Sequence, residues 1–205
     1  MMNTFNLPTS LTLIRLVLSP LILPLFFVYF LPYNFLPLNI VLGFVFVLFG
    51  LTDFFDGFLA RKYNQETELG RMLDPIADKF LVYSTLISML VLNRIYFYWV
   101  VLLIGREFFM MGLRFIALSY HLQLPVSHGA KIKTAIQMLF LTILIVNPYH
   151  ADGLFAAPWI NGIEYGLLVI VLVLAYITTK QYYDAFMQQY NRYTGVIIKG
   201  HIDDI

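Results

Sequence analysis

The sequence predicts an all-α integral membrane protein with six transmembrane helices and both termini in the cytoplasm. Three observations predict this fold class. Of the 205 residues, 60% are hydrophobic and only 12% are charged, which is about half the charge of a typical soluble domain. The apolar residues form long runs, as membrane spans require, and proline and glycine separate these runs. Basic residues gather in alternate loops, which sets the orientation.

Six segments are apolar enough to cross a bilayer, for which about 20 residues suffice. They extend from about Leu11 to Leu31, Leu38 to Arg61, Met72 to Leu92, Tyr96 to Tyr120, Gly129 to Val146, and Gly162 to Tyr182. Proline marks breaks between them, as at Pro32, Pro37 and Pro148. The first segment lacks a basic leading region and contains Arg15, so we expect a retained helix and not a cleaved signal peptide.

Basic residues outside the spans determine the predicted orientation. One set of loops and span ends carries nearly all of them: Arg61, Lys62, Arg71, Lys79, Lys131, Lys133, Lys180, Arg192 and Lys199. The opposite loops hold only Arg94. The positive-inside rule therefore predicts a multi-pass protein of the cytoplasmic (inner) membrane with the basic loops in the cytoplasm. We expect a membrane domain over residues 1–187 and a cytoplasmic tail over residues 188–205.

Composition also excludes several kinds of site and partner. The chain has no cysteine, so it has neither disulfides nor thiolate metal sites. Its formal net charge is +1, which argues against a nucleic-acid partner.

Four aspartates are concentrated in one short stretch of this apolar chain. Asp53 and Asp56 lie three residues apart at the end of one apolar run, and Asp74 and Asp78 lie four residues apart at the start of the next. They are four of only twelve acidic residues. Each pair falls on one helical face, and the pairs can point at each other across a short loop. Carboxylates at a membrane edge are costly and usually functional.

The aspartates predict a metal site at the cytoplasmic side of the membrane. Four carboxylates crowded together need positive charge between them, and their oxygens suit Mg²⁺ or Mn²⁺. Two such ions about 4 Å apart form a clamp for phosphoryl transfer. Between the aspartates, Gly57, Ala60 and Gly70 lack bulk, so a ligand can approach closely. Arg61 can hold a phosphate oxygen or a nucleobase edge.

Structural explanations account for only part of this pattern. Asp74 before Pro75 is a reasonable helix N-cap, and Gly57 alone is better explained by helix packing. Neither explanation covers Asp53 and Asp56, which lie within a predicted helix. A divalent-cation transporter, which is a different functional class, also uses intramembrane acids. It would place them near the midplane of the bilayer, between two halves of the chain that are related by an internal repeat. No internal repeat is found here.

The complete spacing is D-x2-D-G-x2-A-R-x8-G-x3-D-x3-D, from Asp53 to Asp78. It resembles the signature of the CDP-alcohol phosphatidyltransferase family, and all eight fixed positions are filled. Three further stretches resemble the branch of that family that makes phosphatidylglycerophosphate: NLPTSLTLIR from Asn6, GREFFMMGLR from Gly105, and GAKIKTAIQM from Gly129. The resemblance extends from Asn6 to about Gln137.

The resemblance implies a six-helix membrane enzyme, usually a homodimer, that uses two divalent metal ions, Mg²⁺ or Mn²⁺. Such an enzyme transfers the phosphatidyl group of CDP-diacylglycerol to an alcohol and releases CMP. The implied metal ligands are Asp53, Asp56, Asp74 and Asp78, with Asp78 also the general base. The implied residues around CDP are Gly57, Ala60, Arg61 and Gly70.

A second group of charged residues bears on the acceptor alcohol. Arg106 and Arg114 lie in the fourth span, and Lys131 and Lys133 begin the fifth. Four cations near one membrane face suit an anionic acceptor such as glycerol 3-phosphate. The alternative is snorkelling to lipid headgroups, which fits the two lysines better than Arg106. Glu107 can pair with either arginine.

The local resemblance favours transfer of the phosphatidyl group to glycerol 3-phosphate, with membrane lipid as the surrounding partner. Cations at four positions argue against choline or ethanolamine, whose ammonium group favours acidic or aromatic partners. Inositol phosphate, serine and phosphatidylglycerol remain alternative acceptors for the same chemistry. An inactive family member is a further alternative, and the complete aspartate set argues against it.

Overall fold

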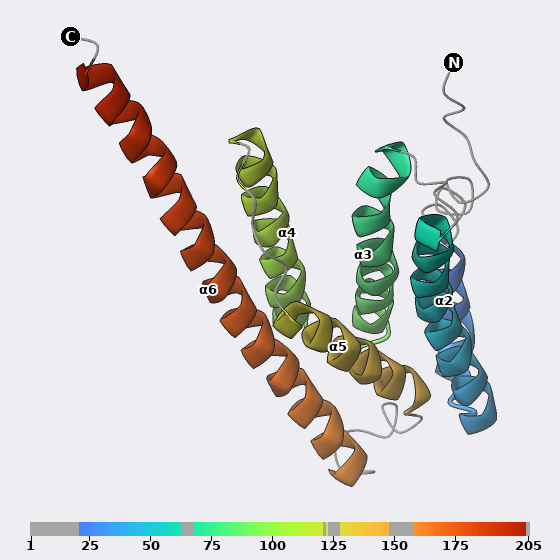
Figure 1. The fold of residues 1–205 in the computed structure, drawn as a ribbon. Coiled ribbons are helices and arrows are strands. Elements are labelled where there is room, and N and C mark those ends of the chain that lie inside the picture. The colour runs from blue at the N-terminus through green and yellow to red at the C-terminus, as the bar shows by residue number, and fades with distance from the viewer. Residues whose placement is uncertain (1–20, 63–67, 121, 123–127, 148–157, 204–205) are drawn as a thin grey trace. The chain divides into compact units, whose positions relative to one another are not determined.

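The computed structural model describes residues 21–62, 68–120, 122, 128–147 and 158–203, with side chains over 21–51, 79–120, 122, 129, 132–147 and 159–193. Every element in these ranges is helical (Figure 1). Residues 21–30 form a helix that continues into a 3-10 turn, η1 (Leu31–Tyr33). The other helices are α2 (Leu36–Lys62), α3 (Glu68–Val91), α4 (Phe97–Ser119), α5 (His128–Val146) and α6 (Pro158–Asp203).

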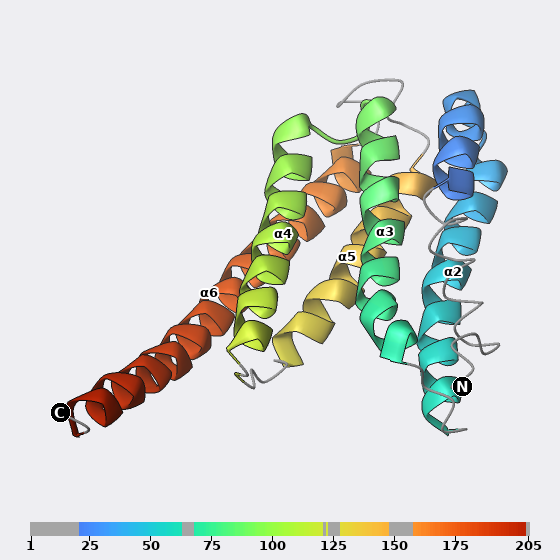
Figure 2. The same ribbon diagram turned by 90° about the horizontal axis from the view of Figure 1, so that it is seen from above.

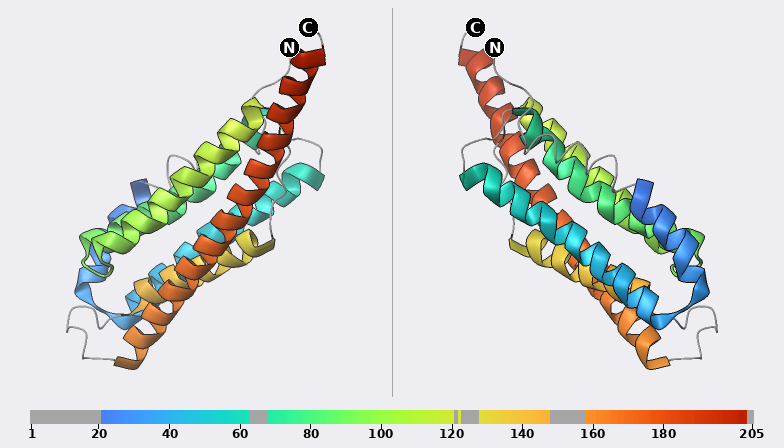
Figure 3. Two further views of the ribbon diagram at one scale, coloured as in Figure 1. Left: turned by 90° about the vertical axis from the view of Figure 1, so that its left-hand side faces the viewer. Right: turned by 90° about the vertical axis from the view of Figure 1, so that its right-hand side faces the viewer.

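The helices follow the predicted segments closely except at the end of α6. Predicted and observed ends agree within a few residues for α2 to α5. The last helix was expected to end near Tyr182, yet α6 continues without a break to Asp203 (Figure 3). Its 46 residues correspond to about 69 Å, more than twice the hydrocarbon thickness of a bilayer. An apolar run predicts the membrane segment of a helix and not the length of the helix.

One helix among the described residues passes a length and composition test for a membrane span: Trp159–Tyr193. Shorter apolar helices are found at Leu21–Tyr33, Leu36–Leu51, Lys79–Val91 and Ile132–Val146.

The chain divides into two compact units. The first unit comprises residues 1–100 and 138–166, and the second comprises residues 101–137 and 167–205. The first unit therefore holds α2, α3, the second half of α5 and the start of α6. The second unit holds most of α4, the first half of α5 and the rest of α6.

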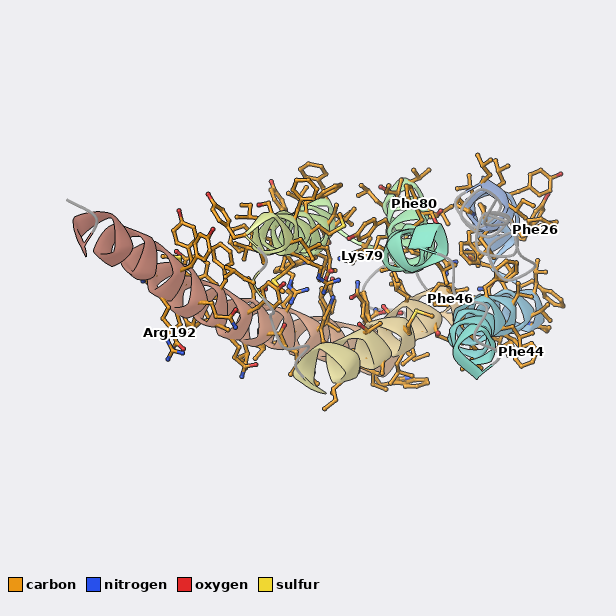
Figure 4. The ribbon with its side chains drawn as sticks, turned by 45° about the horizontal axis from the view of Figure 1, so that its top comes forward. Phe26, Phe44, Phe46, Lys79, Phe80 and Arg192 are labelled. Carbon is orange, nitrogen blue, oxygen red and sulfur yellow. The ribbon has the colours of Figure 1, made fainter. Side chains whose placement is uncertain are left out.

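In the first unit, α2 lies beside α3 (Figures 1 and 2). Phe46 of α2 is fully buried and meets Phe27 edge to face, with 6.4 Å between ring centroids. Phe44, two residues earlier, leaves the opposite side of α2 and is exposed (Figure 4). The periodicity of an apolar helix thus separates a packed face from an outward face, although both faces are apolar.

Two glycines allow α2 to approach α5 within the first unit. A Cβ atom at Gly43 would lie 2.6 Å from Cγ2 of Val146, and one at Gly50 would lie 2.3 Å from Cε of Met138. The two glycines are seven residues apart and therefore share one helical face. Small residues on such a face let helix backbones pack closely in an apolar environment.

Arg94, in the turn after α3, joins this turn to the end of α5 and to η1 in the first unit. Its Nη1 donates to the main-chain oxygens of Leu144, Ile145 and Asn147 at 3.0–3.1 Å. Its Nη2 donates to Leu31 O and to Asn34 Oδ1, both at 3.3 Å. The guanidinium thus pairs with carbonyls at the end of α5, where a helix leaves them without internal partners, and with Leu31 O, which also accepts the backbone N–H of Asn34.

Burial and a nearby carboxylate act in opposite directions on Arg94. Burial lowers the pKa of Arg94 to about 10, and the charge of Glu164 partly offsets this effect. The group remains protonated at neutral pH. Asn147 links the same region to the start of α6, because its Nδ2 donates to Glu164 Oε1 at 2.9 Å. Arg94, the only basic residue in the loops predicted to lie opposite the basic ones, is therefore buried and has a structural role.

The second unit contains an aromatic contact between α4 and the long end of α6. Leu113 and Ala117 of α4 pack with Phe186 of α6 in one buried cluster. Tyr190 extends it, stacking on Phe186 at 5.8 Å and meeting Tyr120 edge to face at 5.3 Å. Arg192, on the same stretch of α6, points away into solvent (Figure 4). This packing holds α6 against α4 as far as Tyr190, past the expected end of the membrane segment near Tyr182.

Candidate functional site

The four aspartates of the predicted metal site belong to two neighbouring helices of the first unit. Asp53 and Asp56 belong to α2, and Asp74 and Asp78 belong to α3. Both helices are regular through these residues, so the spacings of three and four correspond to about one turn each. The side chains of all four aspartates, and residues 63–67 between the helices, lie outside the described residues.

The residues expected around CDP share these helices. Gly57, Ala60 and Arg61 follow Asp56 on the last turns of α2, and Gly70 lies on the first turn of α3. Their surroundings also lie outside the described side chains. All eight fixed positions of the pattern therefore lie either at the end of α2 or at the start of α3.

The donor chemistry of the four aspartates fits hard divalent cations. Two carboxylates on each of two adjacent helices supply an oxygen-only set of ligands, which Mg²⁺ and Mn²⁺ prefer. Elsewhere, among the side chains that the structure describes, no group of three or more histidine, aspartate or glutamate residues could hold a metal ion.

The second unit holds a buried cluster of two cations around one carboxylate. Oε1 of Glu107 accepts a hydrogen bond from Nη1 of Arg106 at 2.5 Å. The same oxygen accepts a hydrogen bond from Nζ of Lys133 on α5. These side chains are only 6–14% exposed. One carboxylate oxygen is thus shared by two cations from two helices.

Two threonines of α6 complete the surroundings of Arg106. Its Nη2 donates to Oγ1 of Thr178, and its Nε donates to Oγ1 of Thr179, both at 2.7 Å. Nε also donates to the carbonyl oxygen of Ala175 at 3.3 Å. The neighbouring helix therefore holds Arg106 along the edge of its guanidinium formed by Nε and Nη2.

The structure brings together two of the four cations predicted for the acceptor. Arg106 and Lys133 meet through Glu107, for which the sequence suggested Arg106 or Arg114 as a partner. Arg114 is exposed on α4 and makes no ion pair or hydrogen bond with the residues the structure describes. The side chain of Lys131 lies outside them.

The snorkelling interpretation is wrong for Lys133. This residue is only 5% exposed and its ammonium group is bonded to Glu107. Sequence spacing could not reveal this, because the carboxylate that holds Lys133 lies 26 positions earlier on another helix.

Sequence reasoning missed Thr178 and Thr179. The signal was present as two adjacent hydroxyls within a long apolar run, directly before Lys180. Threonine is common in apolar helices, where it bonds its own backbone, so the pair by itself did not indicate a site. Only the packing of α6 against α4 identifies these hydroxyls as partners of Arg106.

An apolar groove in the first unit is separate from these charged residues. It has a volume of about 470 Å³ and is lined mainly by apolar side chains from α2, α5 and α6, among them Leu36, Val146 and Trp159. Its polar lining residues, Thr142 and Asn147, are not ionisable. None of the lining residues that the structure describes is an acid or a base.

Comparison with known proteins agrees with the residue pattern. Residues 5–183 match the family model described as CDP-alcohol phosphatidyltransferase. A protein from Rickettsia typhi is 38% identical over 180 residues, covering 88% of this chain and 96% of its own length. Proteins from Sodalis glossinidius and Salmonella choleraesuis are 37% and 35% identical, covering 86% and 88% of this chain and 92% and 94% of their own lengths. All three are named CDP-diacylglycerol–glycerol-3-phosphate 3-phosphatidyltransferase. The chain belongs to the CDP-alcohol phosphatidyltransferase family.

Proposed function

We propose that this protein transfers the phosphatidyl group of CDP-diacylglycerol to glycerol 3-phosphate, giving phosphatidylglycerophosphate and CMP in phospholipid biosynthesis. One observation carries the proposal. All eight positions of the pattern from Asp53 to Asp78 are filled and lie on two neighbouring regular helices. The names of the relatives support glycerol 3-phosphate as the acceptor.

The four aspartates are the proposed ligands of two divalent ions, Mg²⁺ or Mn²⁺. Bound there, such ions neutralise the pyrophosphate of the donor and the charge that develops on the departing CMP. Asp53, Asp56 and Asp74 act only as ligands. Asp78 is both a ligand and the proton acceptor. Gly57, Ala60 and Gly70 leave room for the CDP moiety, and Arg61 binds its phosphate or base edge.

Asp78 starts the reaction by accepting the proton of the acceptor hydroxyl, which must come within about 3 Å of the carboxylate. The hydroxyl oxygen then forms a bond with the lipid-linked phosphorus. The bond from that phosphorus to the CMP oxygen breaks in line with the new bond. The electron pair of the broken bond leaves with CMP, and the proton remains on Asp78.

Arg106 and Lys133 are the proposed binding groups for the phosphate of the acceptor. Both cations have largely buried side chains and contact the same oxygen of Glu107. A phosphate accepts hydrogen bonds from a guanidinium at two oxygens and is attracted by an ammonium group. Arg114 and Lys131 are the further cations proposed to attract it.

The proposed setting is the bacterial inner membrane. Large apolar side chains are well exposed on the described helices, for example Leu25 at 68%, Phe115 at 76% and Tyr176 at 70%. Such surfaces suit lipid better than water. We propose six membrane-spanning helices, cytoplasmic termini, a homodimeric assembly and a site at the cytoplasmic side, where a lipid-linked donor and a water-soluble acceptor can both arrive.

The proposal is tested by measuring CMP release. Purified protein in detergent receives CDP-diacylglycerol, Mg²⁺ or Mn²⁺, and one acceptor from a panel: glycerol 3-phosphate, inositol phosphate, serine or phosphatidylglycerol. We expect CMP release with glycerol 3-phosphate. If CMP is released only with a different acceptor, the proposed reaction class stands and glycerol 3-phosphate is wrong as the acceptor.

A divalent-cation transporter is the competing class, and a second assay separates it. The protein is reconstituted into vesicles that contain a Mn²⁺-sensitive dye. Mn²⁺ uptake without CMP release from any acceptor would overturn the phosphatidyltransferase proposal. CMP release without uptake supports it.

A further inference from the structure

The guanidinium of Arg106 is fixed by the last helix of the chain. Thr178 and Thr179 each place a side-chain oxygen 2.7 Å from a different nitrogen of Arg106. Both threonines belong to α6, more than 70 positions from Arg106 in sequence. All the residues of this contact lie within the second unit.

The hydroxyl hydrogens of both threonines are already used within α6. Thr178 Oγ1 donates to Leu174 O at 2.7 Å and also lies 3.1 Å from Ala175 O. Thr179 Oγ1 donates to Ala175 O at 2.7 Å. Because each hydroxyl proton points back along its own helix, the oxygen lone pairs remain to accept from Arg106. The two threonines therefore act as oriented acceptors for a planar cation.

This arrangement leaves two N–H groups of the Arg106 guanidinium available for a ligand. The single proton of Nε is directed to Thr179 and Ala175 O, Nη1 donates one proton to Glu107, and Nη2 donates one proton to Thr178. A guanidinium has five N–H groups. One N–H on each terminal nitrogen thus has no partner among the residues that the structure describes. Two such donors suit two oxygens of a phosphate.

We propose that Thr178 and Thr179 are positioning residues that hold Arg106 in the orientation that binds the phosphate of the acceptor, so that α6 contributes to acceptor specificity. The inference rests on the proposed function, in which Arg106 binds that phosphate. A fixed guanidinium loses less conformational entropy when it binds than a mobile one does. The threonines therefore strengthen binding without touching the substrate.

A purely structural role for the same contact makes a different prediction. If the threonines only fastened α6 to α4, their loss would lower stability and affect both substrates alike. If they position Arg106, their loss weakens the acceptor selectively, because the donor nucleotide is bound by other residues. The ratio of the two KM changes separates the roles.

The test uses the double variant Thr178→Val/Thr179→Val, which removes both oxygens and keeps the side-chain shape. CMP release is measured in the full-length protein while each substrate is varied. We expect the KM for glycerol 3-phosphate to rise about tenfold or more, in line with the loss of hydrogen bonds to a charged group, and the KM for CDP-diacylglycerol to stay within about twofold. The double variant Thr178→Ser/Thr179→Ser, which retains both oxygens, should restore the acceptor KM.

Thr142→Val is the matched control, because the hydroxyl of Thr142 donates to Met138 O of its own helix and belongs to the first unit. It should leave both KM values unchanged. Equal changes in the two KM values, or no rescue by serine, would overturn the positioning role. If the wild-type protein uses another phosphate-bearing acceptor, the same comparison applies to that acceptor. If it releases CMP only with an uncharged acceptor or with none, the proposed function and this inference both fail.

Discussion

Nη1 of Arg94 donates a hydrogen bond to the carbonyl oxygen of Asn147 at a distance of 3.0 Å, tying the turn after α3 to the end of α5. The same guanidinium also reaches η1. In sequence, Arg94 is the single exception to the clustering of basic residues on one side. Because Arg94 is only 7% exposed, it adds little charge to the surface of the opposite loops, in which it lies.

Replacing Arg94 should destabilise the first unit. Arg94→Lys keeps the charge but cannot reach carbonyls of both η1 and α5, because an ammonium group lacks the planar fork of a guanidinium. We expect a loss of about 2 kcal/mol, measured as a lower midpoint of thermal unfolding in detergent. Arg192→Lys, at an exposed position of α6, is the control and should leave the midpoint unchanged. An equal response of the two variants would contradict the structural role of Arg94.

The two glycines of α2 should tolerate alanine unequally. A Cβ at Gly43 meets the branched end of Val146, which has little freedom to move. A Cβ at Gly50 meets the terminal methyl of Met138, which is flexible. We expect Gly43→Ala to cost about 1–3 kcal/mol and Gly50→Ala clearly less. Thermal unfolding of the two variants side by side measures the difference, and a reversed order would contradict the packing described here.

Asp78→Asn should abolish turnover while leaving nucleotide binding largely intact. The amide keeps the shape of the side chain but cannot accept the hydroxyl proton. CMP release measures the first effect, and equilibrium binding of radiolabelled CDP-diacylglycerol measures the second. Turnover close to that of the wild-type protein would remove Asp78 as the proton acceptor and leave it as a ligand only.

Removing divalent cations should stop CMP release reversibly. Four carboxylates need cations to lie close together and to hold a pyrophosphate. We expect excess EDTA to abolish activity and either Mg²⁺ or Mn²⁺ to restore it after the chelator is removed. Activity that persists in EDTA would contradict a metal-dependent mechanism. Loss of folding is checked by circular dichroism of the EDTA-treated protein.

The aromatic contact between α4 and α6 should support the part of α4 that carries Arg114. Phe186→Ala removes a buried ring that packs on Leu113, the residue next to Arg114, and should cost about 3 kcal/mol. Hydrogen exchange over residues 113–120 measures this effect, with faster exchange expected in the variant. Gln188→Ala, at an exposed position two residues away, is the control. Unchanged exchange in the Phe186 variant would show that α6 does not stabilise this end of α4.

The helical class and the helix bounds of α2 to α5 followed from sequence because apolar runs and proline breaks are local properties. The length of α6 did not follow, because the stretch around Phe186 packs on Leu113 and Ala117 of α4, which are distant in sequence. The family membership followed from eight positions within one stretch, since the pattern is itself a local one.

The contacts of Arg106, Glu107 and Lys133 could not be predicted from local sequence. Residue type and spacing selected Arg106 and Lys133 as cations of one membrane face. The sequence could not reveal that one oxygen of Glu107 binds both of them, nor that two hydroxyls of α6 orient the guanidinium. The sequence by itself determined the bounds of α2 to α5, the family and the aspartate pattern. The tertiary structure decided which charges pair and which helix orients Arg106, because hydrogen bonds between helices depend on packing that sequence spacing does not encode.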